Sequence, residues 1–132
     1  MTAILEKVNA DKGKIESHFH YLHQNPGLAF EEQTAATYIA GKLREWGYEV
    51  TEGIGKTGVV GQLKVGDGKA RIGLRADTDA LPVQEGSTLP YKSRIEGKSH
   101  MCGHDAHASM LLGAAEYLAK TRHFNGTLNL IF

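Results

Sequence analysis

Residues Ser99 to His107 read Ser-His-Met-Cys-Gly-His-Asp-Ala-His, and from Ala106 to Thr121 apolar side chains recur at helical spacing. The stretch therefore predicts a helix that begins at a dense polar cluster, with Asp105 as its cap. Three of the seven histidines and the only cysteine lie in it. Thiolate, imidazole and carboxylate groups are the ligands that zinc and similar metals prefer. We therefore expect a metal site here, with Cys102 and His104 able to face one point across Gly103.

Two other interpretations of this cluster stay open on the residues alone. In one, Cys102 is a small buried side chain and the histidines only cap or solvate the start of the helix. In the other, Cys102 is a nucleophile with His104 or His107 as its base, although such pairs usually come from distant parts of a chain. A structural four-ligand zinc site is disfavoured, because it needs two paired half-sites and the sequence offers one.

Upstream of the cluster, two runs of alternating apolar residues predict strands at 59–65 and 71–76, joined by Gly66-Asp67-Gly68 as a hairpin. The second run leads directly into Asp77 and Asp79. These aspartates could simply form a turn before Pro82. Two carboxylates spaced two apart also share one face of a strand, which suits the binding of a cation or the orientation of a metal-bound histidine.

The remaining periodicity predicts helices at 4–24 and 31–46, short strands at 48–51 and 126–132, and a long loop over 83–98. His23, just ahead of Asn25-Pro26-Gly27, is a further candidate ligand, although histidines in a last helical turn more commonly face solvent. Helices alternate with strands, so we predict an α/β fold in which a layered sheet has flanking helices, within a single domain.

Composition limits the classes of function. The 132 residues contain 15 basic and 15 acidic side chains, without a basic block, which argues against nucleic acid or an anionic membrane as partner. One cysteine excludes an internal disulfide, and the N-terminal residues lack a continuous apolar segment. We therefore expect a soluble, cytoplasmic protein.

Several segments together resemble the metal-dependent amidohydrolases of peptidase family M20, in the branch of hippurate hydrolases, N-acyl-amino-acid amidohydrolases and auxin-conjugate hydrolases. They occur in the family's order and cover nearly the whole chain. The matching segments are Leu22-His23-Gln24-Asn25-Pro26 with Phe30-Glu31-Glu32, Lys56-Thr57-Gly58-Val59-Val60, Gly73 to Pro82, His100 to His107, and Leu111 to Ala115.

The resemblance implies a zinc-peptidase-like catalytic domain that uses two divalent metal ions, of manganese, zinc, cobalt or nickel, to hydrolyse N-acyl amino acids or related amides. It implies that Cys102 and His104 are metal ligands and that Asp79 supports the metal site from the strand end. It implies only a supporting role for Asp77, His100 and His107, whose side chains would orient the metal ligands without binding a metal themselves.

The resemblance also implies features that residues 1–132 lack. In the family, a Gln-Pro-Ala-Glu-Glu segment with the general base and a further ligand follows the strand that ends at Phe132, and a smaller domain usually mediates dimerisation. The resemblance therefore predicts that residues 1–132 are a truncated portion of the catalytic domain of a hydrolase with a small-molecule substrate, itself a possible homodimer. We expect these residues to be inactive on their own, because the general base would lie beyond Phe132. The alternative is a catalytically inactive fragment that binds metal weakly. The last strand, 128–132, is expected to expose an edge that favours aggregation.

Overall fold

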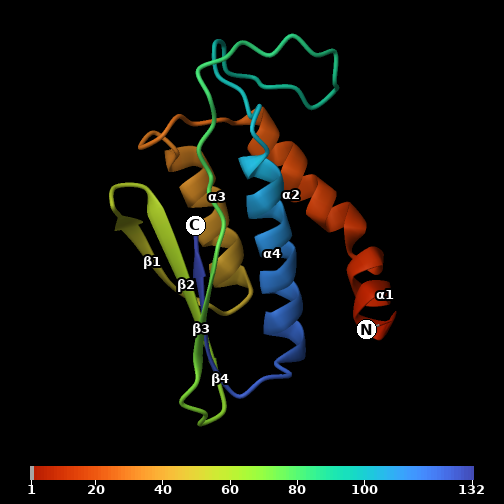
Figure 1. Cartoon of the computed structure of the whole chain (residues 1–132), viewed down its shortest axis with the longest axis vertical. Coiled ribbons are helices and arrows are strands. Elements are labelled where there is room, and N and C mark those ends of the chain that lie inside the picture. Colours follow the sequence, from red (N-terminus) through yellow and green to blue (C-terminus); the bar gives the residue numbers. More distant parts are fainter. Residues whose placement is uncertain (1) are drawn as a thin grey trace.

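The computed structural model describes residues 2–132 as four helices and four strands (Figure 1). In chain order the elements are α1 (Thr2–Ala10), α2 (Lys12–Gln24), α3 (Gln33–Glu45), β1 (Glu49–Ile54), β2 (Gly58–Val65), β3 (Arg71–Arg75), α4 (His104–Thr121) and β4 (Gly126–Ile131). The prediction of an α/β fold with a sheet and flanking helices is confirmed.

The four strands form one mixed sheet in the order β1-β2-β4-β3. β2 pairs antiparallel with both β1 and β4, whereas β3 pairs parallel with β4. The predicted hairpin of β2 and β3 is therefore wrong, because β4 lies between these strands. A parallel pair needs a long crossover connection, and the segment from residue 76 to 125, which includes α4, supplies it for β3 and β4.

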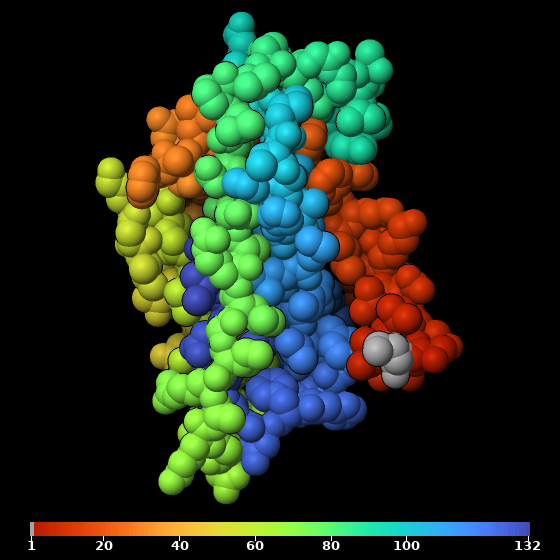
Figure 2. Space-filling view, viewed as in Figure 1, coloured from red at the N-terminus to blue at the C-terminus, as the bar shows by residue number. Residues whose placement is uncertain are grey.

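The last strand occupies the interior of the sheet. Leu128 and Leu130 of β4 are 3% and 0% exposed, because both neighbouring strands and the helices cover them. The expectation of an exposed terminal edge is therefore wrong for β4. The edges belong to β1 and β3, and Ile72 of β3 is 58% exposed. Figure 2 shows residues 70–80, in green, at the surface beside α4.

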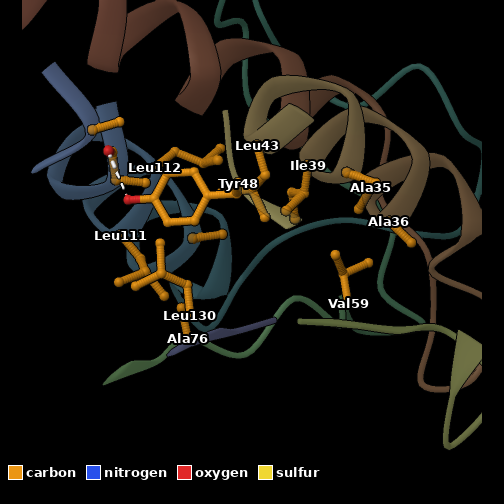
Figure 3. Packing of buried hydrophobic residues seen from close by; sticks show 14 of the residues in the cluster. Ala35, Ala36, Ile39, Leu43, Tyr48, Val59, Ala76, Leu111, Leu112 and Leu130 are labelled. Atoms are coloured by element: carbon orange, nitrogen blue, oxygen red, sulfur yellow. Dashed lines mark hydrogen bonds between the residues drawn. The ribbon is translucent and has the colours of Figure 1, made fainter. Parts of the chain in front are cut away.

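The apolar core lies between the sheet and helices α3 and α4 (Figure 3). Leu43 of α3, Leu112 of α4 and Leu130 of β4 are all 0% exposed. Helix α3 approaches β2 so closely that a Cβ at Gly61 would lie 2.9 Å from the Leu43 side chain. Tyr48 crosses this layer and donates a 2.9 Å hydrogen bond from its hydroxyl to the carbonyl of Ala115, which anchors the start of β1 to α4.

The predicted helix at 4–24 is interrupted at Asp11. The side chain of Asp11 forms an ion pair with Lys14 at 2.9 Å, and its carbonyl accepts the backbone N–H groups of Lys14 and Ile15. Aspartate favours such local bonding over a helix interior. The resulting α1 contains no buried residue and is the element farthest from the strands (Figure 1). Among the described helices, none has the length and apolar character required to span a membrane.

Candidate metal centre

The polar cluster gathers where β3 ends and α4 begins. Asp77 and Asp79 directly follow β3, and His104 is the first residue of α4. The predicted cap, Asp105, is wrong, because Gly103 occupies the N-cap position with φ 105°. This left-handed conformation suits glycine. The turn at Gly103 thus directs the first turn of α4, with His104 and His107, toward the end of β3.

Two aspartates hold the two histidines. His104 places Nδ1 2.9 Å from Asp79 Oδ1 and 3.0 Å from the Asp79 carbonyl. Its other nitrogen, Nε2, lies 3.5 Å from Asp77 Oδ2. His107 Nδ1 lies 2.8 Å from Asp77 Oδ1, and this bond is the main reason that the pKa of Asp77 is lowered. Asp79 therefore fixes the orientation of the His104 ring, and Asp77 links His104 to His107.

Asp77, His104 and His107 form a group that could hold a metal ion. Each offers one ligand atom, and these atoms lie within 4.8 Å of one another; residues 2–132 contain this group alone. Imidazole nitrogen and carboxylate oxygen suit zinc, manganese and similar ions. A carboxylate on the second nitrogen of a ligating histidine is also typical of metal sites, as Asp79 provides for His104. The donor set therefore fits a divalent transition metal.

Two other residues that the sequence suggested for the site, Cys102 and His100, do not belong to this group. Cys102 is exposed and does not belong to this group, so its role as a ligand stays a prediction. His100 is only 7% exposed, and its Nδ1 is buried without a hydrogen-bond partner among the described residues. Burial lowers the pKa of His100. His100 therefore lies next to the cluster with one ring nitrogen that no described residue engages.

Behind the cluster, His23 lies between two buried carboxylates. Its Nδ1 is 2.6 Å from Asp105 Oδ2, and its Nε2 is 3.1 Å from Glu85 Oε1. Burial would lower the pKa of His23, but the bonds to Asp105 and Glu85 raise it. His23 therefore links α2, α4 and the loop before the cluster, and both of its ring nitrogens are engaged.

Sequence reasoning missed Glu85. Its carboxylate accepts hydrogen bonds of 2.6 Å from the Ser87 hydroxyl and 2.6 Å from the Ser93 backbone N–H, besides the contact with His23. Burial would raise the pKa of Glu85, but these bonds lower it to about 2. A single glutamate within a polar loop gives no periodic signal, so only the unusual length of the loop pointed to this segment.

A cavity of ≈ 310 Å³ opens beside the cluster. Asp77 and Asp79 line one side, and the other sides come from the α2–α3 loop, the β1–β2 turn and the end of β4. The cavity thus lies beyond the carboxyl ends of the parallel strands β3 and β4, the usual place for a site on such sheets. A second cavity of ≈ 310 Å³, beside β3 and the end of α4, has a mainly apolar lining that includes none of the cluster residues.

Comparison with known proteins identifies related chains. Residues 73–132 match peptidase family M20/M25/M40. The hippurate hydrolase of Campylobacter jejuni is 56% identical over 92% of this chain and 31% of its own length. Thermostable carboxypeptidase 2 of Saccharolobus solfataricus is 40% identical over 98% of this chain and 34% of its own length.

A solved structure agrees with the fold. The crystal structure of a Bacillus subtilis protein, described as a dinuclear metal-binding peptidase from the M20 family, matches with a TM-score of 0.87 and 35% identity. The match covers 94% of this chain and 35% of the Bacillus subtilis chain. The chain therefore spans about a third of the length of these relatives.

Proposed function

Because the chain belongs to peptidase family M20, we propose that the protein is a metal-dependent hydrolase of the amide bond of N-acyl amino acids or related small amides. One observation carries this proposal. A group of donor atoms from Asp77, His104 and His107, with His104 oriented by Asp79, lies beside a cavity large enough for part of a small amide. Hippurate and peptides, named by the relatives, are both amides of this kind.

We propose that the working protein holds two divalent ions, as the Bacillus subtilis relative does. Manganese, zinc, cobalt and nickel all suit the donor atoms. A bound divalent ion polarises an amide carbonyl and lowers the pKa of a coordinated water toward neutrality. In this chain His104 would bind through Nε2, because Asp79 engages Nδ1.

Two assignments of the ligand next to His104 follow. In the first, which comes from the sequence, Cys102 is the ligand and Asp77 and His107 orient the site. In the second, which the spacing of the donor atoms favours, Asp77 and His107 bind directly. Both assignments place His104 at the centre and Asp79 behind it.

We assign no general base to residues 2–132. The three carboxylates that line the cavity are already engaged, Asp77 by His107, Asp79 by His104 and Glu32 by the Thr57 hydroxyl. Removal of a general base typically costs about two to four decades of rate. A second candidate function follows from this arrangement: residues 1–132 on their own bind metal weakly and do not hydrolyse a substrate.

The test is to strip the purified protein of metal, reload it separately with manganese, zinc, cobalt or nickel, and assay N-acetyl and N-benzoyl amino acids. We expect metal-dependent turnover that His104→Ala abolishes and that His123→Ala, at an exposed histidine outside the cluster, leaves intact. Turnover that survives chelation would contradict the proposal. Metal bound without turnover would support the second candidate.

Metal stoichiometry distinguishes the two ligand assignments. If Cys102 is a ligand, Cys102→Ser lowers the number or affinity of the bound ions more than Asp77→Asn does. If Asp77 and His107 bind directly, the order is reversed. Inductively coupled plasma mass spectrometry of the dialysed variants gives the answer, with no need for an active preparation.

A further inference from the structure

His23 is buried between two carboxylates that come from distant parts of the chain. Its ring contacts Asp105, in the first turn of α4, through Nδ1, and Glu85, in the loop before the cluster, through Nε2. Figure 1 shows the end of α2, which carries His23, beside the start of α4. His23 does not line the cavity beside the cluster, so any effect on the metal centre must pass through a neighbouring residue.

The two carboxylates call for a donor at each nitrogen of the His23 ring. Glu85 also accepts hydrogen bonds from two serines of its loop, one on each of its oxygens, as an ionised carboxylate does. Asp105 accepts the backbone N–H of Ala106 on the oxygen that His23 leaves free. A neutral imidazole carries one N–H group, whereas the imidazolium ion carries two. The arrangement therefore suits a doubly protonated His23 that donates to both carboxylates.

Asp105 connects His23 to the metal cluster, because it directly follows His104. The His104 ring faces Asp79 at the cluster, whereas the Asp105 side chain faces His23 and is 3% exposed. The first turn of α4 has no side-chain cap, since Gly103 occupies the N-cap position. The bond between His23 and Asp105 therefore holds this turn from the side opposite the cluster.

Aromatic rings surround His23. The centre of its ring lies 5.6 Å from that of Phe19 and 5.5 Å from that of Tyr91, and Tyr91 in turn stacks on His20 at 4.0 Å. Hydrogen bonds between charged groups are stronger where water is excluded. The two bonds of His23 should therefore hold its ring, and the residues bonded to it, in one arrangement.

We propose that His23 is a positioning residue of the metal centre: through Asp105 it fixes the first turn of α4, and thereby the direction in which His104 presents Nε2 to a metal ion. The bond to Glu85 has a separate role, which is to hold the loop before the cluster. This inference rests on the proposed function, since it assumes that His104 binds a metal. It applies to both of the ligand assignments given above, because both place His104 at the centre.

Two substitutions separate the two bonds of His23. The side-chain N–H of asparagine lies close to the place of histidine Nδ1, and that of glutamine lies close to the place of Nε2. His23→Asn should therefore keep the bond to Asp105 and lose the bond to Glu85, and His23→Gln should do the opposite. His20→Gln is the matched control, since His20 lies one turn earlier on α2 and stacks on Tyr91.

Each variant is titrated with cobalt, whose visible absorption spectrum depends on the geometry of its ligands. We expect His23→Gln to weaken cobalt binding about ten- to hundredfold, as loss of a group that orients a ligand typically does, and His23→Asn to weaken it less than about threefold. The spectrum should change in His23→Gln and stay the same in His23→Asn and His20→Gln. Equal losses in the two His23 variants would show that His23 only stabilises the fold, and they would overturn the inference, as would unchanged binding in both.

Should His23→Gln fail to fold, Asp105→Asn takes its place, because an amide cannot accept hydrogen bonds from His23 and the Ala106 N–H on separate oxygens. A cobalt spectrum that changes in Asp105→Asn supports the inference, and an unchanged one overturns it. Should the unmodified protein bind no cobalt, the proposed function fails first. The nitrogen-15 chemical shifts of the His104 ring in the metal-free protein then decide the inference alone: a change in His23→Gln that is absent from His23→Asn supports it, and any other pattern overturns it.

Discussion

The core layer between the sheet and helices α3 and α4 differs in its stabilisation from the polar loop, which we define as residues 77–103. The core layer consists of leucines, alanines and other apolar side chains packed against regular strands and helices. The polar loop has no helix or strand and only isolated bridges, such as the one between Leu81 and Ser99. Even so, Glu85, Ser99 and His100 are buried in it, at 6%, 0% and 7% exposure.

Hydrogen bonds stabilise the conformation of the polar loop, whereas apolar contacts stabilise the core layer. The Ser99 hydroxyl donates to the Val83 carbonyl at 2.6 Å, and Glu85 connects the loop to α2 through His23. Apolar packing is non-directional and tolerates repacking, whereas buried polar groups carry a penalty as soon as a partner is lost. The fold and the candidate site can therefore be damaged separately. Damage to the core should lower global stability, and damage to the loop should open it locally.

The largest effect is expected from a cavity in the core layer. Leu112 is 0% exposed, so Leu112→Ala should lower the free energy of unfolding by about 2–5 kcal/mol. Urea denaturation followed by circular dichroism measures this loss. Met110→Ala on the same helix is the control, because Met110 is 61% exposed and should change stability by less than about 0.5 kcal/mol. Similar losses in both variants would show that the core is not where the structure places it.

A smaller and more local effect is expected from Glu85→Gln. The neutral amide keeps the shape of the side chain but cannot accept the hydrogen bonds from Ser87, Ser93 and His23 together. We expect a loss of about 1–3 kcal/mol, with faster hydrogen exchange at the Ser93 amide and little change at core amides such as Leu112. Glu96→Gln, at an exposed glutamate in the same loop, should leave exchange unchanged. Uniformly faster exchange throughout the protein would contradict the separation of the two regions.

The same contrast explains what could be predicted from the sequence. The segments with periodic apolar residues are helices or strands near the expected positions, since burial of one face imposes a regular spacing of apolar residues. The pairing of strands was not predictable in this way, because β2 and β3 have a turn between them that is compatible with a hairpin. Only the long-range pairing of β4 decides that it separates them, since Leu130 pairs with Gly61 of β2 on one side and with Leu74 of β3 on the other.

The candidate site shows a similar division. The family resemblance implied that Asp79 supports a metal site to which His104 contributes a ligand, and His104 Nδ1 lies 2.9 Å from Asp79 Oδ1 in the structure. Asp77 and His107 were expected only to orient the ligands. The gathering of their donor atoms with that of His104 into one group was not predicted, since it depends on how the turn at Gly103 directs α4. Glu85 and Asp105 around His23 escaped prediction for a related reason: their contacts join residues 62 and 82 positions apart.

The stability of the polar loop should depend on pH, because Glu85 and His23 both have shifted pKa values. The folded pKa of Glu85 is about 2, below its ordinary value of 4.5, so its contribution to stability is full above pH 4.5 and is lost as the pH falls toward 2. His23 has a raised pKa, so its contribution is full below its ordinary value of 6.5 and is lost as the pH rises through the folded value. We expect the metal-free loop to be most protected between about pH 4.5 and 6.5.

Hydrogen exchange of the loop amides across this range, or limited proteolysis, measures the protection. In the Glu85→Gln variant, the protection of the loop amides should no longer fall as the pH drops from 4.5 toward 2, because glutamine does not titrate. Exchange of the core amides should be unaffected. A profile of the variant that superimposes on that of the unmodified protein would mean that Glu85 does not control the loop.

The smallest effect is expected from the single polar bond inside the core layer. Tyr48 is 4% exposed, and its hydroxyl donates to the Ala115 carbonyl at 2.9 Å. Tyr48→Phe keeps the ring and removes this donor, while the carbonyl lies within α4, where a backbone N–H one turn later can still serve it. No buried group is then left without a partner, in contrast to Glu85→Gln, so the loss should be only about 0.5–1.5 kcal/mol. Thermal unfolding of the two variants side by side tests this order. If Tyr48→Phe proved the more harmful, directional bonding would matter as much in the core layer as in the polar loop, and the distinction between the two regions would fail.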